Sequence, residues 1–275
     1  LRKCEGQAMV TPTPGQQLFA AIKQTTRAGQ PGLVLPVGQP LVAVIRPIAT
    51  VPGHTDALDV QLLTEWRNRH VKSFLTEFVS TPERTAAWLA GAVHQNPGKM
   101  LFMVETLDGE RVGHVGLGFI DWQRGYGEAD AIVSGGASPP GVMKASLLVL
   151  MRWARDALGL QTLAVRVRSD NPAVEFYRKV GFQEYQRVPI VAKTVPGGVD
   201  WSEDPGAAGA PASLWRCAAG CGRRLQCPAR RARARSGSAA RPGGLHASRP
   251  GAAGPACAPA RWYGAGPAAA AAGRA

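Results

Sequence analysis

The stretch SDNPAVEFYRKVGF, residues 169–182, encodes a short helix together with both of its ends. Pro172 suits the first turn of a helix, where a missing N–H costs no hydrogen bond, and Asn171 just before it can cap that turn through its side chain. Gly181 permits the left-handed conformation in which many helices end. The sequence therefore predicts a helix of about two turns that begins and ends at defined residues.

The larger apolar and aromatic residues inside this helix predict which of its faces is buried. Phe176 and Val180 lie four apart on one face, and Val174 and Tyr177 lie three apart on the neighbouring one. We expect Phe176 and Val180 to anchor the helix on a sheet. Tyr177 would then project its hydroxyl towards a cleft; the alternative is a core aromatic residue whose hydroxyl is hydrogen-bonded.

Residues 41–200 around this helix alternate between strand and helix patterns. β-Branched runs predict strands, and Asp108-Gly109 between two apolar runs is a strong hairpin signal. The order is not that of a doubly wound fold, so we predict an α/β (α+β) domain with a mixed sheet and helices on both faces. The predicted elements are a strand at 41–49, helices at 55–70 and 81–96, a hairpin at 100–120, a strand at 127–135, a helix within 135–159, a strand at 160–169, the short helix, and a final strand or bent pair at 182–195.

The two flanking segments differ from this domain in composition. Residues 1–40 predict a loosely structured leader with one weak helix around QQLFAAIKQ. Residues 205–275 contain eleven Arg but no Asp, Glu or Lys, and no Val, Ile, Phe or Met. Such a segment cannot bury enough apolar area to offset its chain entropy, so we expect residues 201–275 to form a disordered tail. Its Ala/Gly/Pro/Arg bias fits either a genuine basic tail or a stretch translated from a shifted reading frame.

The net charge of +13 describes the tail rather than the domain, because eleven of these charges lie in residues 205–275 and only two remain elsewhere. A nearly neutral domain gives no sign of a nucleic-acid or membrane partner. We therefore expect nucleic acid to bind, if at all, only non-specifically through the Arg-rich tail.

Cysteine usage and hydropathy exclude several further classes. Residues 5–216 contain no Cys, which excludes a cysteine nucleophile and a disulfide framework from the domain. Cys217, Cys221 and Cys227 are separated by three and five residues, which does not match the usual close zinc pairs, so no metal is expected. The most apolar stretch, ASLLVLMRWA, is interrupted by Arg152 and is too short to cross a bilayer, so we expect a cytoplasmic protein.

Three features taken together resemble the GNAT superfamily of acetyl-CoA dependent N-acetyltransferases. They are the order of strands and helices, the glycine- and proline-rich loop before the long helix, and the SDNPAVEFYRKVGF motif with its Asn-Pro, its Tyr and its following Gly-Phe. The resemblance covers residues 42–195, and EWRNRH with VGHVGLG resembles the branch that holds ribosomal-protein and amino-sugar acetyltransferases. It implies a mostly antiparallel central sheet and acetyl-CoA as the co-substrate.

The resemblance also implies two catalytic roles. Tyr177 would lie near the thioester sulfur and protonate the departing CoA thiolate. A phenol with a reference pKa of about 10 can serve a thiolate near 8.5 only if it is held in place. A carboxylate on the strand at 127–135 would take the proton of the amine, directly or through water. Glu128 and Asp130 lie two apart on one face, and we prefer Glu128; the alternative is that both are solvated edge charges.

The resemblance places the acetyl-CoA site along the strand at 127–135 and the loop after it. Backbone groups of Val133 and Ser134 are expected to pair with the pantetheine arm, and Asn171 to bond the same arm unless it serves as the cap alone. The start of the long helix would receive the pyrophosphate, because unpaired N–H groups and the helix dipole favour anions. The family's Gln or Arg, Gly, one residue, and Gly or Ala are replaced here by Ser138, Gly141 and Met143. The residues expected to form the pyrophosphate cradle are Gly135, Gly136, Gly141, Val142, Met143 and Lys144.

The end of the helix at 55–70 is where this branch builds its acceptor pocket, and it carries Trp66, Arg67 and Asn68. Arg67 and Asn68 are expected to bind sugar hydroxyls, a phosphate or a peptide carboxylate. The alternative is a C-terminal cap with a buried Trp66. His114, amid apolar strand residues, is expected to be a packed structural residue.

These expectations together predict an N-acetyltransferase that moves an acetyl group from acetyl-CoA to the primary amine of a small molecule such as an amino sugar. A domain without Cys suits direct attack with no covalent intermediate. A GNAT-like binding module that has lost catalysis, a protein N-terminal or ribosomal-protein acetyltransferase, and a nucleic-acid-binding protein acting through its tail stay open as alternatives. The sequence also leaves a homodimer open.

Overall fold

The computed structural model describes residues 11–136, 138–207, 210 and 212–219. The chain divides into a unit of Leu1–Gly222 and a second unit, Arg223–Ala275, which lies outside the described residues. The elements of the first unit are α1 Pro14–Thr25, β1 Leu35–Val37, β2 Ala43–Pro47, α2 Ala57–Arg69, a 3-10 turn η1 Val71–Ser73, β3 Thr76–Glu77, α3 Pro82–Trp88, a π-helical turn η2 Leu89–Val93, β4 Met100–Thr106, β5 Arg111–Asp121, β6 Tyr126–Ser134, α4 Val142–Leu158, β7 Thr162–Arg168, α5 Ala173–Val180, β8 Phe182–Val195, β9 Gly198–Glu203 and β10 Ala212–Ala219.

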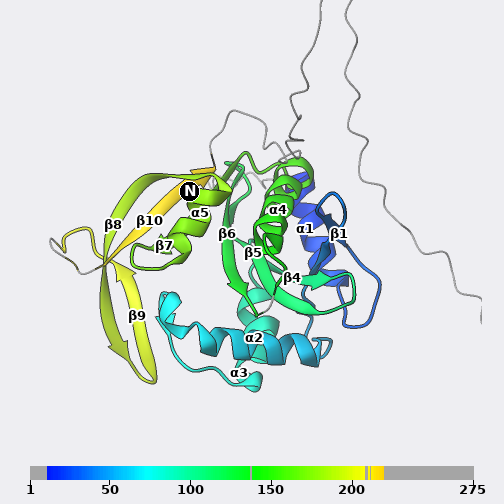
Figure 1. Cartoon of the computed structure of the whole chain (residues 1–275), viewed down its shortest axis with the longest axis horizontal. Helices are drawn as coiled ribbons and strands as arrows, with labels where there is room; N and C mark the ends of the chain where they lie inside the picture. The colour runs from blue at the N-terminus through cyan, green and yellow to red at the C-terminus, as the bar shows by residue number, and fades with distance from the viewer. Residues whose placement is uncertain (1–10, 137, 208–209, 211, 220–275) are drawn as a thin grey trace, which may run out of the picture. The chain divides into compact units, whose positions relative to one another are not determined.

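The strands form one mixed sheet in the order β1-β2-β4-β5-β6-β7-β10-β8-β9-β3. Neighbouring strands are antiparallel except β6 and β7, which are parallel. The helices α1 and α4 lie on one side of the sheet and α2 and α3 on the other (Figure 1). The predicted mixed, mostly antiparallel sheet with helices on both faces is confirmed.

Two hydrophobic cores, one on each face, hold these layers together. Residues of β4 alternate between them: Phe102 points into the core shared with α1 and α4, whereas Leu101 and Met103 point into the core shared with α2 and η2. This alternation follows from the two-residue period of a strand that is covered on both sides. The sheet is therefore anchored to both helical layers through the same strand.

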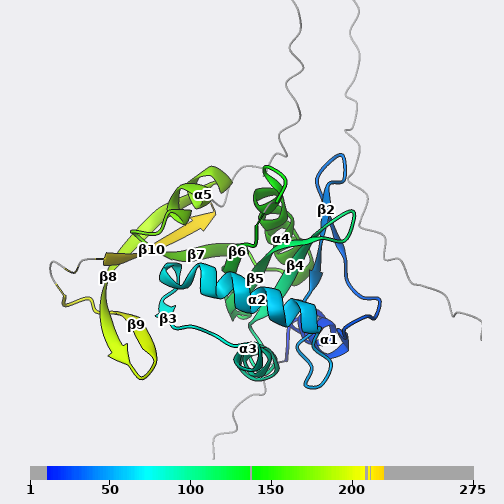
Figure 2. The same cartoon turned by 60° about the horizontal axis from the view of Figure 1, so that its bottom comes forward.

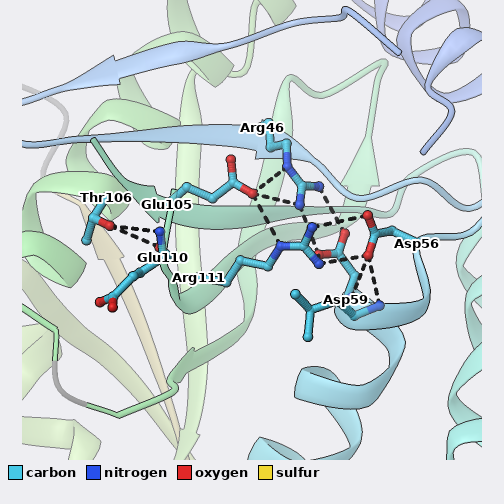
Figure 3. A network of polar contacts seen from close by, with 8 residues as sticks. Arg46, Asp56, Asp59, Glu105, Thr106, Glu110 and Arg111 are labelled. Carbon is cyan, nitrogen blue, oxygen red and sulfur yellow. Dashed lines mark hydrogen bonds and ion pairs between the residues drawn. The ribbon is translucent and has the colours of Figure 1, made fainter. Parts of the chain in front are cut away.

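A buried ionic network fixes the start of α2 on the sheet (Figure 3). The Asp59 carboxylate is fully buried and accepts hydrogen bonds from both terminal nitrogens of Arg46 at 2.9 Å. Arg111 pairs with Asp59 at 2.9 Å and with Asp56 at 2.7 Å, and Glu105 accepts from Arg46 at 2.8 Å. Two guanidinium groups thus offset the cost of burying this carboxylate. The network sets the position from which α2 runs towards the site.

The helix predicted around QQLFAAIKQ is present as α1, but the prediction that residues 1–40 are loosely structured is wrong for the packing of α1 and for β1. Phe19 and Ile22 of α1 are buried in the core under α4, and β1 pairs with β2. Thr13 caps α1 by accepting from the Gln16 N–H, and Pro14 occupies its first turn. The stability of this segment was not predictable from local sequence, because a short amphipathic helix is stabilised by tertiary packing rather than by its intrinsic helix propensity.

The prediction of a disordered tail at residues 201–275 is wrong for its first part. β9 ends at Glu203 and pairs with β8, and β10 inserts between β7 and β8 in the middle of the sheet. Leu214 and Trp215 of β10 are buried, which compensates for the poor strand propensity of the surrounding Ala residues. The predicted disorder of residues 220–275 falls outside the described residues. Within the described part of the chain, no helix is long and apolar enough to cross a membrane.

Leu214→Ala should lower the free energy of unfolding by about 2–5 kcal/mol, because it leaves a cavity beneath a central strand. Chemical denaturation of the full chain measures this cost. Leu58→Ala, on an exposed position of α2, is the matched control and should cost no more than about 0.5 kcal/mol. If the two variants were equally stable, residues 212–219 would not form a buried strand of the sheet.

Candidate functional site

The site begins where β6 and β7 separate. The two parallel strands share only the pairs Tyr126 with Thr162, Gly127 with Leu163, and Glu128 with Ala164. Beyond them the facing edges of β6 and β7 have no strand partner, while β6 stays paired with β5 and β7 with β10 on their other edges. Because buried backbone groups require hydrogen-bond partners, this open edge is suited to an extended ligand that can supply them.

A cavity of about 980 Å³ fills the gap between the diverging strands. Its walls come from β6, β7, the end of α2, the segment 73–80, α3 and the start of α5. The segment 73–80 follows α2 and contains β3, which pairs with β9 at one end of the sheet, beside the end of α2 (Figure 2). Glu77 of β3 fixes this segment through a 2.8 Å ion pair with Arg168 and a 2.8 Å hydrogen bond from Trp201.

A bulge shapes the β6 wall of the cavity. Ala131 has a φ of 49° and Phe119 on the neighbouring strand β5 a φ of 51°, both in the left-handed region that residues with a Cβ rarely adopt. The register of β5 and β6 shifts on either side, between His114 and Gly116 and between Gly118 and Asp121. Such bulges redirect side chains and backbone groups, and here they do so along the open edge of β6.

Tyr177 lines the cavity, as predicted, but it is also packed. Its ring is 9% exposed and contacts the rings of Phe176 and Phe182 edge-on, with centroids 5.5 and 5.9 Å away. The buried face of α5 consists of Val174, Tyr177 and Val180. Of the predicted anchor pair, Val180 is buried, and Phe176 is half-buried and packs against the same core. Burial, with smaller effects of Asp130 and Cys217, raises the pKa of Tyr177 above its ordinary value, so the phenol keeps its proton at neutral pH.

Glu128 also lines the cavity, and both of its carboxylate oxygens accept hydrogen bonds. Arg166 Nε donates to Oε2 at 2.6 Å, and the Tyr126 hydroxyl donates to Oε1 at 2.7 Å. The alternative of a solvated edge charge is excluded, because Glu128 is 6% exposed. Burial first, and then the bond to Glu128, raises the pKa of Tyr126. Asp130 lines the same wall and pairs with Lys99 Nζ at 2.6 Å.

His114 of β5 lines the cavity and packs against Trp66 behind it. Their rings stack with centroids 6.0 Å apart, and both residues are buried. Burial lowers the pKa of His114 to about 4, so its imidazole is neutral at physiological pH, as a structural residue should be. Trp66, predicted to bind the acceptor, does not line the cavity. Its ring lies against the backbone of Gly135 instead.

The predicted cofactor residues fall into two groups. Val133 and Ser134, at the end of the open edge of β6, line the cavity. The other group, in the loop and at the start of α4, does not line it: Gly135, Gly136, Gly141, Val142, Met143 and Lys144.

Hydrogen bonds and packing within the loop account for much of the second group. The Gly135 N–H donates to Val112 O, the Val142 N–H donates to Pro139 O, and the side chain of Met143 is buried against Gly113. The first-turn N–H groups of Met143 and Lys144 have no acceptor within a helix and are the donors left for an anion.

The Asn171 side chain satisfies a free N–H in the first turn of α5, as predicted, although Asn171 stands one residue before the N-cap position. Its Oδ1 accepts from the Ala173 N–H at 2.8 Å, and its Nδ2 donates to Ser73 O at 3.0 Å. The amide thereby links the start of α5 to Ser73, in the segment that follows α2. Asn171 also lines the cavity. Pro172, predicted at the first helical position, stands at the N-cap position instead.

Arg67 and Asn68 lie at the end of α2, where they were predicted, but only Arg67 lines the cavity. Asn68 is paired with Ser80 in both directions: Nδ2 donates to Ser80 O at 2.9 Å and Oδ1 accepts from the Ser80 N–H at 2.8 Å. It therefore fixes the loop before α3 and does not face the cavity where a substrate would bind. The predicted binding role is thus unsupported for Asn68.

Several residues of the site were missed from the sequence. Arg166 and Arg168 stand on β7, Lys99 precedes β4, and Arg84 begins α3. The alternation of Arg166, Val167 and Arg168 was a usable signal, because alternate polar residues on an otherwise apolar central strand indicate one polar face. The sequence around Lys99 and Arg84 contains no signal of a role at the site, because that role depends on which element packs opposite them in the fold.

A family model described as an acetyltransferase (GNAT) domain matches residues 45–183, just over half of the 275 residues. The chain belongs to the GNAT acetyltransferase family. It is thus an N-acetyltransferase whose acetyl donor is acetyl-CoA, and the predicted family is confirmed. No curated protein matches it. The described residues contain no cluster of His, Cys, Asp and Glu that could hold a metal ion.

Solved structures share the GNAT fold with this chain at low sequence identity. A spermidine N-acetyltransferase from Vibrio cholerae, in complex with CoA and spermine, is 16% identical over 64% of this chain and 94% of its own, with a TM-score of 0.50. A probable acetyltransferase is 14% identical over 68% of this chain and 96% of its own, also with a TM-score of 0.50. A GCN5-related N-acetyltransferase from Brucella melitensis is 16% identical over 71% of this chain and 82% of its own, with a TM-score of 0.48.

Gly135→Ala should weaken acetyl-CoA binding and lower the melting temperature of this GNAT enzyme. A Cβ there would lie 2.2 Å from Trp66 Cε2, so the end of β6 must shift, at a cost of about 1–3 kcal/mol. Gly136→Ala is the matched control, because the nearest atom to its Cβ is 4.0 Å away on Arg69. Calorimetry with CoA and a thermal melt measure both effects. If the two variants bind CoA equally well, the end of β6 does not shape the site.

Proposed function

We propose that the enzyme transfers the acetyl group to the primary amine of a small molecule, such as an amino sugar, by direct attack. One observation carries this proposal: Tyr177, Glu128 and the open edge of β6 line the same cavity. A volume of about 980 Å³ is at the upper end of the range typical of small-molecule sites. A cavity of this kind suits an acceptor that is enclosed together with the acyl donor.

The residues available for holding acetyl-CoA fit an extended thioester with an anionic end. Backbone groups of Val133 and Ser134 on the open edge of β6 would bind the pantetheine arm. The N–H groups of Met143 and Lys144 at the start of α4 would receive a phosphate, with the Lys144 side chain adding positive charge. Acetyl-CoA supplies an activated acetyl group as a thioester. The described part of the chain contributes no cysteine nucleophile to the cavity, since Cys217 is buried in β10 outside it.

Glu128 is assigned the proton of the attacking amine. An amine attacks a carbonyl only through its unprotonated lone pair, and the new C–N bond leaves one proton to be removed. Each carboxylate oxygen of Glu128 accepts one hydrogen bond from the protein and can accept another. Arg166 and Tyr126 hold the carboxylate in one orientation, so a water or the amine itself meets a fixed acceptor.

Tyr177 is assigned the proton for the departing sulfur. Its raised pKa keeps the phenol protonated but makes free transfer to a thiolate uphill, so the hydroxyl must be placed at the sulfur before the C–S bond breaks. The packing of its ring against Phe176 and Phe182 supports this role, because it would hold the hydroxyl in one position. A rigid donor requires no reorganisation when negative charge develops.

Tyr177→Phe should lower kcat by about 100-fold, because it removes the acid and keeps the ring. Acetyl-CoA affinity and the melting temperature should stay near those of the natural protein, since the packed ring is retained. Thiol release with an amine panel gives kcat, and calorimetry gives the affinity. An unchanged kcat would remove Tyr177 from the mechanism.

Glu128→Gln should lower turnover by about 100-fold at neutral pH, because an amide cannot accept the amine proton. Raising the pH increases the fraction of free amine and should recover part of this loss. Glu184→Gln, an exposed member of a surface pair with Arg187, is the control for a lost carboxylate. A loss of stability without a change in the pH profile would indicate a positioning role only.

A further inference from the structure

The acceptor side of the cavity contains two arginines that no carboxylate neutralises. Five Lys and Arg residues line the cavity, and three of them have acidic partners: Lys99 with Asp130 at 2.6 Å, Arg166 with Glu128 at 2.6 Å, and Arg168 with Glu77 at 2.8 Å. The remaining two are Arg67 and Arg84. Among the described residues, no Asp or Glu lies within ion-pair distance of either one.

Arg67 and Arg84 both stack on the ring of Phe78. Their guanidinium carbons lie 3.8 and 3.7 Å from the centroid of Phe78, and Arg67 also lies 4.6 Å from the centroid of Phe74. Burial first, and then the positive charge of Arg84, lowers the pKa of Arg67. Two like charges on one ring repel each other, and an anion that contacts both guanidinium groups would offset this repulsion.

The hydrogen bonds of Arg67 also leave capacity for a ligand. One terminal nitrogen donates to Thr76, at 2.6 Å to the carbonyl and 3.2 Å to the hydroxyl, which fixes the side chain in place. Nε is buried and has no hydrogen-bond partner in the described part of the chain. A guanidinium carries five N–H donors, and a buried donor without an acceptor is destabilising. A ligand that supplies a hydrogen-bond acceptor to Arg67 would therefore be favoured.

We propose that Arg67 and Arg84 bind an anionic group on the acceptor, a carboxylate or a phosphate, while its amine is acetylated. The inference rests on the proposed function and narrows its substrate class to amines that carry such an anion. The cavity offers no unpaired carboxylate to a polycationic acceptor. Among the described residues that line it, the acidic ones are Glu128 and Asp130, and both are paired with cations. Guanidinium groups match both anions through paired N–H donors.

Matched acceptors with and without the anion test the proposal on the full chain. Glucosamine 6-phosphate is compared with glucosamine, phenylalanine with phenylalanine amide, and spermidine serves as the polycation. Thiol release should give a kcat/KM at least tenfold higher for the anionic member of at least one pair, and which pair responds identifies phosphate or carboxylate. Equal values within both pairs, or a preference for spermidine, would overturn the proposal.

Arg84→Met removes one charge and keeps an apolar stem against Phe78. It should raise KM for the anionic acceptor about tenfold or more and leave KM for the neutral analogue and for acetyl-CoA within about twofold. Arg187→Met is the matched control, because Arg187 is exposed and stacks on Trp215 at 4.5 Å outside the cavity. A raised KM for acetyl-CoA instead would assign the anion to CoA and contradict the proposal.

Two further measurements keep this proposal separate from the transferase mechanism. Arg84→Lys and Arg67→Lys keep the positive charge, so they should prefer the anionic acceptor over its neutral analogue more strongly than Arg84→Met does. They also test the proposal if the Met variant does not fold. Calorimetry with glucosamine 6-phosphate and with phenylalanine reports binding without turnover. The natural protein could bind one of these anions, lose that binding in Arg84→Met, and yet release no thiol with any amine. That outcome would support the anion site and refute the proposed acetyl transfer. Absence of binding of both anions would refute the anion site.

Discussion

The early end of the parallel pairing between β6 and β7 is the constraint on which the rest of this structure depends. Three residue pairs join the strands, and beyond Glu128 their facing edges separate while each keeps the neighbour on its other edge. A sheet opened in this way exposes backbone groups that must be satisfied, and its interior must be covered on both faces. The cavity, the bulge at Ala131 and the covering helices are all consequences of that separation.

Two buried ionic groups hold the covering elements over this opening. Asp59, between Arg46 and Arg111, fixes the start of α2, and Glu77, between Lys72 and Arg168, fixes the segment that follows it. The hydrogen bond from Lys72 is the largest of several effects that lower the pKa of Glu77 to about 2. Buried pairs of this kind contribute little net stability, but they define one orientation and penalise the loss of either partner.

Residues at the site have structural and chemical roles at once. Tyr177 is part of the packed face of α5, Asn171 caps that helix and bridges to Ser73, and Glu128 is held by Arg166 and Tyr126. Packing and hydrogen bonds thus position the groups that the chemistry requires, which is how a rigid scaffold lowers the cost of organising a reaction. The pair of Arg67 and Arg84 differs, because its charge has no partner within the described chain.

Local sequence determined the elements whose signals are local: the 169–182 motif predicted a helix ending at Gly181, and Asp108-Gly109 predicted the hairpin between β4 and β5. It also predicted the family and placed Tyr177, Glu128 and Arg67 at the cavity. Only tertiary structure decided that Trp66 packs under Gly135, that Asn68 pairs with Ser80, and that β10 joins the sheet. The physical reason is that each of these depends on a partner distant in sequence, and neither composition nor periodicity records which surfaces meet.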